Sequence, residues 1–220
     1  MKNPCTSFPV KRERRKEARP GEIVAAALQV FVTQGFNAAR MEDVAKQAGV
    51  AKGTVFRYFP TKGDLFKAVV QANLSDQFTT WRSKIAAFEG SSAELIRLAM
   101  LEWWNHTGST PAAGISRIFL QEAKNFPDLA EYYHQTVIQP GRDILQSIFE
   151  RGVRRGEFRE ADTNAAKALM MAPMLFLAMG QLEAQHRHSM LAIDQTPEQF
   201  ITQLADIVVN GLKQSPGVHS

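Results

Sequence analysis

Residues 52–59, near the N-terminus, are predicted to form a helix with one face suited to nucleic-acid contact. At 100° per residue, Val55 and Phe59 fall within about 40° of each other and face inward. The opposite half carries a glycine, a hydroxyl, a guanidinium and a phenol, at Gly53, Thr54, Arg57 and Tyr58. Such a face favours close approach to a DNA backbone and to base edges. The alternative is an ordinary polar helix surface.

The residues that must position this helix have the pattern of a helix-turn-helix over about 40–59. Ala45 is small where two helices have to cross closely, and Gly49, four residues later, can take the positive φ of a sharp turn. Val50 and Val55 fill the angle between the two helices. Gly53 costs about 1 kcal/mol relative to alanine within a helix. A reason to tolerate it is that a side chain there would hold the helix away from a groove.

No residue set in the chain has the spacing of a metal or catalytic site. One cysteine, Cys5, excludes an intrachain disulfide and a multi-cysteine metal site. The five histidines lack an i, i+4 pair: His106, His134, His186, His188 and His219. There is also no phosphate-binding glycine loop and no nucleophile motif. The sequence therefore predicts a protein without metal, cofactor or enzymatic activity.

Charge is divided unevenly along the 220 residues. Residues 1–67 hold 13 Lys and Arg against 6 Asp and Glu, whereas residues 68–220 hold 13 against 16. A basic front on a mildly acidic remainder indicates that the front meets a polyanion. Residues 1–16 are expected to be a flexible basic arm, with a solvated tail as the alternative. No stretch reaches the ~18 uncharged residues of a membrane span, and no secretory signal is present, so we expect a cytoplasmic chain without membrane contact.

Almost every segment has helical periodicity, which predicts an all-α fold of about nine helices. Pro20 and Gly35 bound the first apolar stripe, and Asp64 is the expected N-cap of a long helix that ends near Phe88. The later helices are expected at about 93–107, 113–125, 128–152, 162–187 and 196–213. Pro140 and Pro173 are expected to kink two of them.

The segment AALQVFVTQGFNAARMEDVAKQAGVAKGTVFRYFPTKGDLF resembles the DNA-binding domain of TetR-family transcriptional regulators. Its stretch GVAKGTVFRYFPTKGDLF is highly specific for that family. The resemblance covers about residues 17–77 and implies a helix-turn-helix DNA-binding domain there. It implies an effector-binding and dimerisation domain over 78–220, in a bacterial regulator.

The resemblance also implies which residues contact DNA. The recognition-helix positions are Lys52, Gly53, Thr54, Phe56, Arg57 and Tyr58. Thr54, Tyr58 and Lys62 match positions that commonly hold phosphates. Arg57 is the candidate for a bidentate contact to guanine. Two departures, Ala39-Arg40-Met41 and Ala51, replace usual Ser or Thr caps, and Arg40 is our candidate for a compensating phosphate contact.

For the C-terminal region, the resemblance implies a cavity for a small, hydrophobic or aromatic effector. The candidate lining residues are Trp103, Trp104, His106, Phe119, Glu122, Tyr133, Met171, Met174 and Gln181. Each is bulky and adaptable, or polar and in need of a partner. The alternative is that these residues are plain core.

The last two long helices are too apolar for solvated surface helices, and the resemblance implies that they form a homodimer interface. The expected function is a homodimeric repressor that binds a palindromic double-stranded DNA operator and is released by its effector. Two other classes compete with this interpretation. An enzyme finds no support among the motifs. A nucleoid-coating or membrane-surface protein would bind all duplexes equally and lose most of that binding with salt.

Overall fold

The computed structural model describes residues 10–161, 163–183 and 195–213. The side chains of 10–18 and 181–183 are not part of that description. The chain divides into two compact units, residues 1–69 and 70–220. The predicted boundary after residue 77 therefore lies eight residues later than the structural one.

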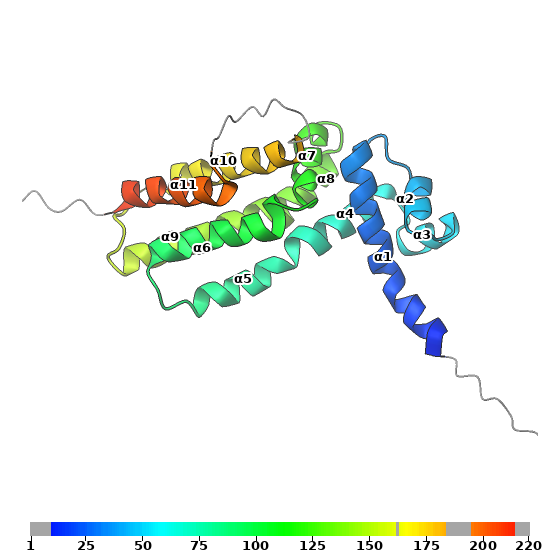
Figure 1. Ribbon diagram of the computed structural model, residues 1–220, viewed down its shortest axis with the longest axis horizontal. Helices are drawn as coiled ribbons and strands as arrows, with labels where there is room; N and C mark the ends of the chain where they lie inside the picture. The colour runs from blue at the N-terminus through cyan, green and yellow to red at the C-terminus, as the bar shows by residue number, and fades with distance from the viewer. Residues whose placement is uncertain (1–9, 162, 184–194, 214–220) are drawn as a thin grey trace, which may run out of the picture. The chain divides into compact units, whose positions relative to one another are not determined.

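The N-terminal unit contains α1 (Val10–Gln34), α2 (Met41–Gln47), α3 (Lys52–Tyr58) and α4 (Lys62–Val70), which ends at the unit boundary (Figure 1). Part of the expected flexible arm, residues 10–16, is helical, because α1 already begins at Val10. Lys, Arg, Glu and Ala are good helix formers, and here they extend the helix beyond Pro20.

Three aromatic rings hold the core of this unit together. Phe31, Phe36 and Phe66 come from α1, from the loop after it and from α4, and their ring centroids lie 5.1–5.7 Å apart. All three side chains are buried, as is Ile23 at the start of the predicted apolar stripe. The stripe therefore fixes the position of α1 against α4.

The C-terminal unit is all-helical over its described residues. It contains η1 (Gln71–Ser75), α5 (Gln77–Ala86), α6 (Ser92–Trp103), η2 (Trp104–Gly108), α7 (Ala113–Glu122), α8 (Pro127–Tyr133), η3 (His134–Ile138), α9 (Gln139–Arg154), α10 (Thr163–Glu183) and α11 (Pro197–Leu212). The η segments are π-helical turns. η1 joins α4 to α5 and η3 joins α8 to α9, whereas η2 extends the end of α6. The described chain therefore forms nine helical segments, which agrees with the predicted number of about nine.

Two helices differ in detail from the sequence prediction. Asp64 is not the N-cap of α4. Its carboxylate accepts hydrogen bonds from the backbone N–H and the hydroxyl of Thr61, so Thr61 starts the helix and Asp64 lies one turn inside it. The expected long helix to Phe88 contains the π-turn η1 and ends at Ala86. The predicted end of α10 at Arg187 lies outside the described residues.

The helical run in which a kink at Pro140 is expected contains the π-turn η3 directly before the proline. Proline has no N–H to donate to the carbonyl of Thr136, four residues earlier. The Ser75 hydroxyl donates to this carbonyl at 3.2 Å. The chain thus stays helical from α8 through η3 into α9. The carbonyl that Pro140 leaves without a donor accepts a hydrogen bond from Ser75 of η1 instead.

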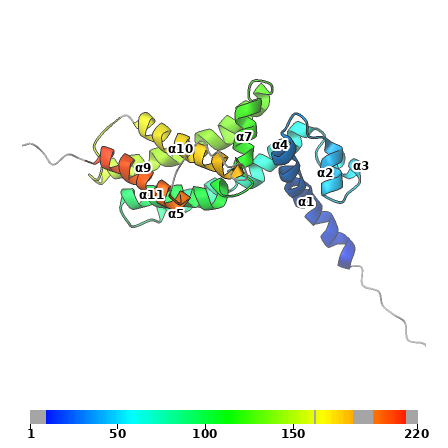
Figure 2. The same ribbon diagram turned by 45° about the horizontal axis from the view of Figure 1, so that its top comes forward.

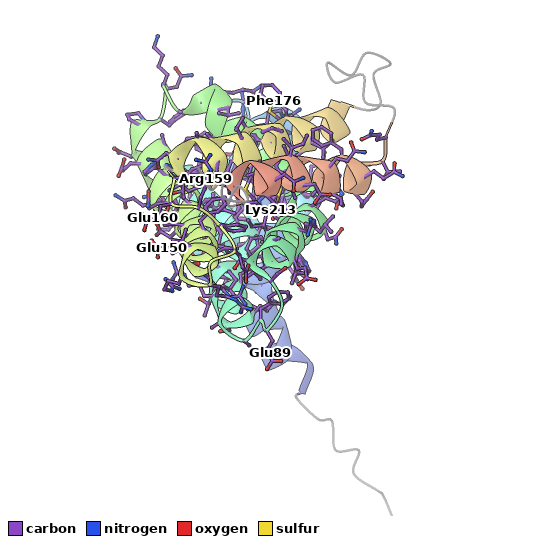
Figure 3. The ribbon with its side chains drawn as sticks, turned by 90° about the vertical axis from the view of Figure 1, so that its left-hand side faces the viewer. Glu89, Glu150, Arg159, Glu160, Phe176 and Lys213 are labelled. Atoms are coloured by element: carbon purple, nitrogen blue, oxygen red, sulfur yellow. The ribbon has the colours of Figure 1, made fainter. Side chains whose placement is uncertain are left out.

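The core of the C-terminal unit is formed by α6, α9, α10 and α11 together with the Phe158 segment that follows α9. α11 lies along α6 and also packs against α10 (Figures 1 and 2). Thr196 starts α11 as predicted, because its hydroxyl accepts the Gln199 N–H at 3.3 Å. After α9, the Arg159 backbone N–H donates to the Leu212 carbonyl at 2.8 Å. Figure 3 labels Arg159 and Lys213, which follows Leu212.

Among the described residues, no helix is long and apolar enough to span a membrane.

Candidate functional site

The turn between α2 and α3 has the geometry that the sequence predicts. Gly49 has φ +65°, and Ala45 is buried where the helices cross. The Val50 N–H donates to the Ala45 carbonyl at 3.0 Å, which closes the turn. Val55 is fully buried, so the inner side of α3 is fixed and its outer side is presented to solvent.

On the outer side, the exposed residues of α3 are Lys52, Gly53, Phe56 and Arg57, whereas Thr54 and Tyr58 are half-buried. A Cβ added to Gly53 would meet nothing within 4 Å. The protein itself therefore leaves room for a side chain there.

Arg57 and Tyr58 form one unit at the end of α3. The guanidinium carbon lies 5.0 Å from the centroid of the Tyr58 ring, and its Nη2 donates to the Tyr58 hydroxyl at 3.3 Å. A guanidinium stacked on a ring keeps a defined plane, which suits bidentate contact with a base edge or a phosphate. Both positions were predicted as DNA contacts.

The N-termini of α2 and α3, which lack the usual Ser or Thr cap, are stabilised in different ways. Arg40 precedes α2, and its backbone N–H donates to the Asp43 carboxylate at 3.3 Å. Asp43, the third residue of the helix, thus supplies the return bond of a capping box, which satisfies the N–H of the cap residue itself. Ala51 makes no side-chain capping bond at α3. Instead Lys52, the first residue of α3, pairs with Glu42 on α2, and this ammonium lowers the pKa of Glu42 below its ordinary value.

Lys62, a predicted phosphate contact, is bound within the protein itself. Its ammonium donates to the carbonyls of Phe36 at 2.7 Å, Asn37 at 3.0 Å and Ala39 at 3.0 Å, and it lies 4.7 Å from the Phe36 ring centroid. An ammonium has three N–H donors, and each has a carbonyl partner here. Lys62 therefore binds the loop that connects α1 to α2. In this structure Lys62 thus has a structural role, and the phosphate contact stays a prediction.

The C-terminal unit contains a cavity of about 360 Å³. It is bounded by residues of η1, α5, α6, η2, α7, α8, η3, α9 and α10. Five of the predicted lining residues do border it: Trp103, Phe119, Tyr133, Met171 and Met174. Its volume lies within the range of small-molecule sites.

Three other candidates do not border the cavity. Trp104 is buried in the core, and its indole Nε1 donates to Glu198 at 3.2 Å. His106 is exposed, with its imidazole 3.5 Å from the Glu102 carboxylate. A hydrogen bond from Lys84 lowers the pKa of that carboxyl.

Glu122, the third, lies at the end of α7 and accepts a hydrogen bond from Asn125 at 3.0 Å. The side chain of Gln181 lies outside the described residues.

Adjacent residues on a helix point about 100° apart, and this separates Trp103, at the cavity, from Trp104, in the core.

Sequence reasoning missed several lining residues. The polar ones are Ser116, Arg142 and Thr107, and the apolar ones include Phe78, Trp81, Leu120 and Leu145. The Ser116 and Tyr133 hydroxyls are hydrogen-bonded at 2.8 Å, and the Tyr133 ring stacks on Phe119 with centroids 4.3 Å apart. Burial raises the pKa of Tyr133 to about 12. The sequence offered one signal for these residues, which is that Ser116 is a polar residue within an apolar helix face.

Within the part of the chain that the structure describes, no three His, Cys, Asp or Glu side chains are grouped as metal ligands.

A helix-turn-helix with an exposed second helix, joined to an all-helical unit with an internal cavity, defines a DNA-binding regulator. Two family models match the chain. Residues 23–69 match the family of bacterial regulatory proteins named tetR, and residues 95–207 match the tetracyclin repressor-like C-terminal domain. The chain belongs to the TetR family of transcriptional regulators. Both models describe regulators rather than enzymes.

Individual relatives agree with this assignment. The transcriptional activator FasR of Mycolicibacterium smegmatis is 36% identical over 61 residues, which is only 28% of each chain. The transcriptional repressor KstR2 of Rhodococcus jostii is 24% identical over 145 residues, or 66% of this chain and 70% of the relative. The crystal structure of Bacillus subtilis FadR in complex with stearoyl-CoA has a TM-score of 0.71 at 18% identity, covering 87% and 98% of the two chains, and supports the fold.

Proposed function

We propose that this protein is a homodimeric repressor that binds a palindromic operator and is released by a small, hydrophobic or aromatic effector. The observation that carries the proposal is the combination of the exposed α3 face with a lined cavity in the same chain. The α3 face offers Lys52, Gly53, Phe56 and Arg57 to DNA. Arg40, exposed at the start of α2, adds a phosphate contact.

The dimer is supported by exposed apolar side chains on the last two helices. Leu169 and Phe176 of α10 are 60% and 50% exposed, and Ile207 of α11 is 71% exposed. Leu169 and Phe176 are seven residues apart and so share one face of α10, along with exposed Ala165 and Ala172. Figure 3 labels Phe176 on α10. An apolar face of this kind on a water-soluble helix favours burial against a second copy.

The effector is proposed to act through the helical run from α4 to α5. Leu74 of η1 and Phe78 and Trp81 of α5 border the cavity, and the same run of chain begins at α4, directly after α3. A ligand in the cavity therefore contacts a segment that is covalently continuous with the DNA-binding unit. The effector must bind the DNA-free conformation more tightly, because otherwise the equilibrium does not shift.

The test is selection of binding sites from a random duplex library at physiological salt. We expect an enriched palindrome whose half-sites lie about one DNA turn apart, ~34–36 Å. We also expect a specificity ratio of about 10³ or more over random duplex. Equal affinity for all duplexes, with binding lost as salt rises, would instead identify a protein that coats DNA without sequence preference.

A further inference from the structure

The wall of the cavity is apolar except at a few points. Thr107, Ser116 and Tyr133 contribute neutral hydroxyls, and the last two are hydrogen-bonded to each other. Arg142, in the first turn of α9, is the one lining residue with a formal charge. The cavity is therefore lined mainly by apolar side chains, with a single cationic residue in its wall.

Arg142 differs from the other arginines of α9. Arg154 pairs with Glu150, and Arg151 binds the carbonyls of Phe88 and Gly90. Arg142 donates from Nη2 to the side-chain oxygen of Asn164 at 3.2 Å. Among the ion pairs of the described residues, none involves Arg142. The arginine at the cavity is thus bound by a neutral amide oxygen, and no described carboxylate forms an ion pair with it.

A second cation lies one turn further along the same pair of helices. Lys167 of α10 is only 7% exposed, and its ammonium donates to the side-chain oxygen of Gln146 on α9 at 2.8 Å. Gln146 also accepts from Thr163 and donates to Glu150, which is the nearest carboxylate in this chain of contacts. Buried lysines are almost always paired with an acid, and no described ion pair includes Lys167. Its neighbour Ala168 borders the cavity.

We propose that the effector is an amphiphile whose oxyanion head group, a carboxylate or a phosphate, is bound by Arg142. Its apolar body fills the cavity. Lys167 adds positive potential from the next turn, and the fork of N–H donors on Arg142 matches the paired oxygens of such a head group. This proposal rests on the proposed function of the cavity as the effector site.

The test uses three ligands with the same ten-carbon chain: decanoate, decyl phosphate and decanol. Calorimetric titration of the full-length protein gives their affinities. Quenching of Trp81 and Trp103, which both border the cavity, reports where they bind. We expect at least one anion to bind about 10-fold or more tightly than decanol, because hydrogen bonds to charged groups are worth roughly that much. The tighter of the two anions identifies the head group.

The variant Arg142→Gln should remove this preference. It should weaken the anion by about 10- to 100-fold and leave decanol unchanged, and unchanged decanol binding also shows that the cavity is intact. Arg154→Gln, on the same helix but away from the cavity, is the matched control and should bind all three ligands like the wild-type protein.

Three results would overturn the proposal in distinguishable ways. If the wild-type protein binds decanol as tightly as the anions and releases operator DNA with each of them, the cavity is an effector site without an anion anchor. If none of the three binds or releases operator DNA, the effector role of the cavity fails as well. An anion preference that persists in Arg142→Gln also contradicts the assignment to Arg142.

Discussion

The hydroxyl groups of Ser116 and Tyr133 lie 2.8 Å apart in the wall of the cavity, between helices α7 and α8. Both residues are buried, and the Tyr133 ring stacks on Phe119. This pair gives the apolar cavity a fixed polar point. It also couples the protonation of Tyr133 to folding, because burial raises the pKa of the phenol to about 12.

Tyr133 should therefore make stability fall at alkaline pH. Its pKa is about 10 when unfolded and about 12 when folded, so its stabilising contribution is complete below pH 10 and is lost as pH rises towards 12. Between pH 9 and pH 11, the free energy of unfolding should fall by about 1–1.5 kcal/mol more in the wild-type protein than in Tyr133→Phe. Urea unfolding of both proteins at the two pH values measures this difference. Parallel changes in the two proteins would show that the phenol ionises equally in both states.

Lys62→Met should destabilise the N-terminal unit. The change leaves three carbonyls of the 36–39 loop without their ammonium donor, and we expect a loss of about 2 kcal/mol in the free energy of unfolding. Lys46→Met, at an exposed position of α2, is the control and should change stability by less than about 0.5 kcal/mol. If Lys62 acted only as a phosphate contact, stability would be unchanged and the salt dependence of DNA binding would fall by about one charge.

Gly53→Ala should stabilise the fold and weaken DNA binding. An added Cβ meets nothing in the protein, so alanine should gain about 0.5–1 kcal/mol of helix stability. The same methyl group would stand between α3 and the DNA groove. Gly21→Ala in α1, where a Cβ is equally unobstructed, is the matched control and should give a similar rise in melting temperature with unchanged affinity. Equal operator affinity for Gly53→Ala would show that DNA does not approach this position closely.

Arg57→Ala should relax sequence choice as well as affinity. Loss of a bidentate base contact costs about 1–3 kcal/mol on the operator and removes the preference at the base pair that is read. Arg40→Ala is expected to weaken all duplexes alike and to lower the salt dependence by about one charge, because its proposed contact is a phosphate. Binding-site selection with each variant separates the two roles. Retention of the full wild-type consensus by Arg57→Ala would assign the base contact elsewhere.

Phe176→Glu and Ile207→Glu should each dissociate the proposed dimer. In a two-fold interface both subunits carry the substitution, so each variant would place two unpaired carboxylates on an apolar surface. Sedimentation at micromolar concentration should show a monomer with weakened operator binding. Leu98→Glu changes a leucine that is 38% exposed on α6, and it should leave the assembly unchanged. A dimer that tolerates both changes must use another surface.

The sequence by itself determined the features that depend on short spacing. Ala45, Gly49 and Val55 lie within eleven residues, and the helical repeat alone fixes which of them face inward. Helix periodicity and the Thr196 cap likewise predicted the helical segments and the start of α11. These inferences hold because the interactions concerned are formed by neighbours in the chain.

The tertiary structure decided the features that depend on distant partners. The ammonium of Lys62 binds the Phe36 carbonyl, 26 residues earlier, so a residue that resembles a phosphate contact has a structural role. Trp103 borders the cavity, whereas the indole of Trp104 donates to Glu198, 94 residues later. Two adjacent tryptophans have the same hydrophobicity, and local sequence does not reveal which one has a partner. Side-chain function at such positions is set by packing between helices, which the spacing along one helix does not encode.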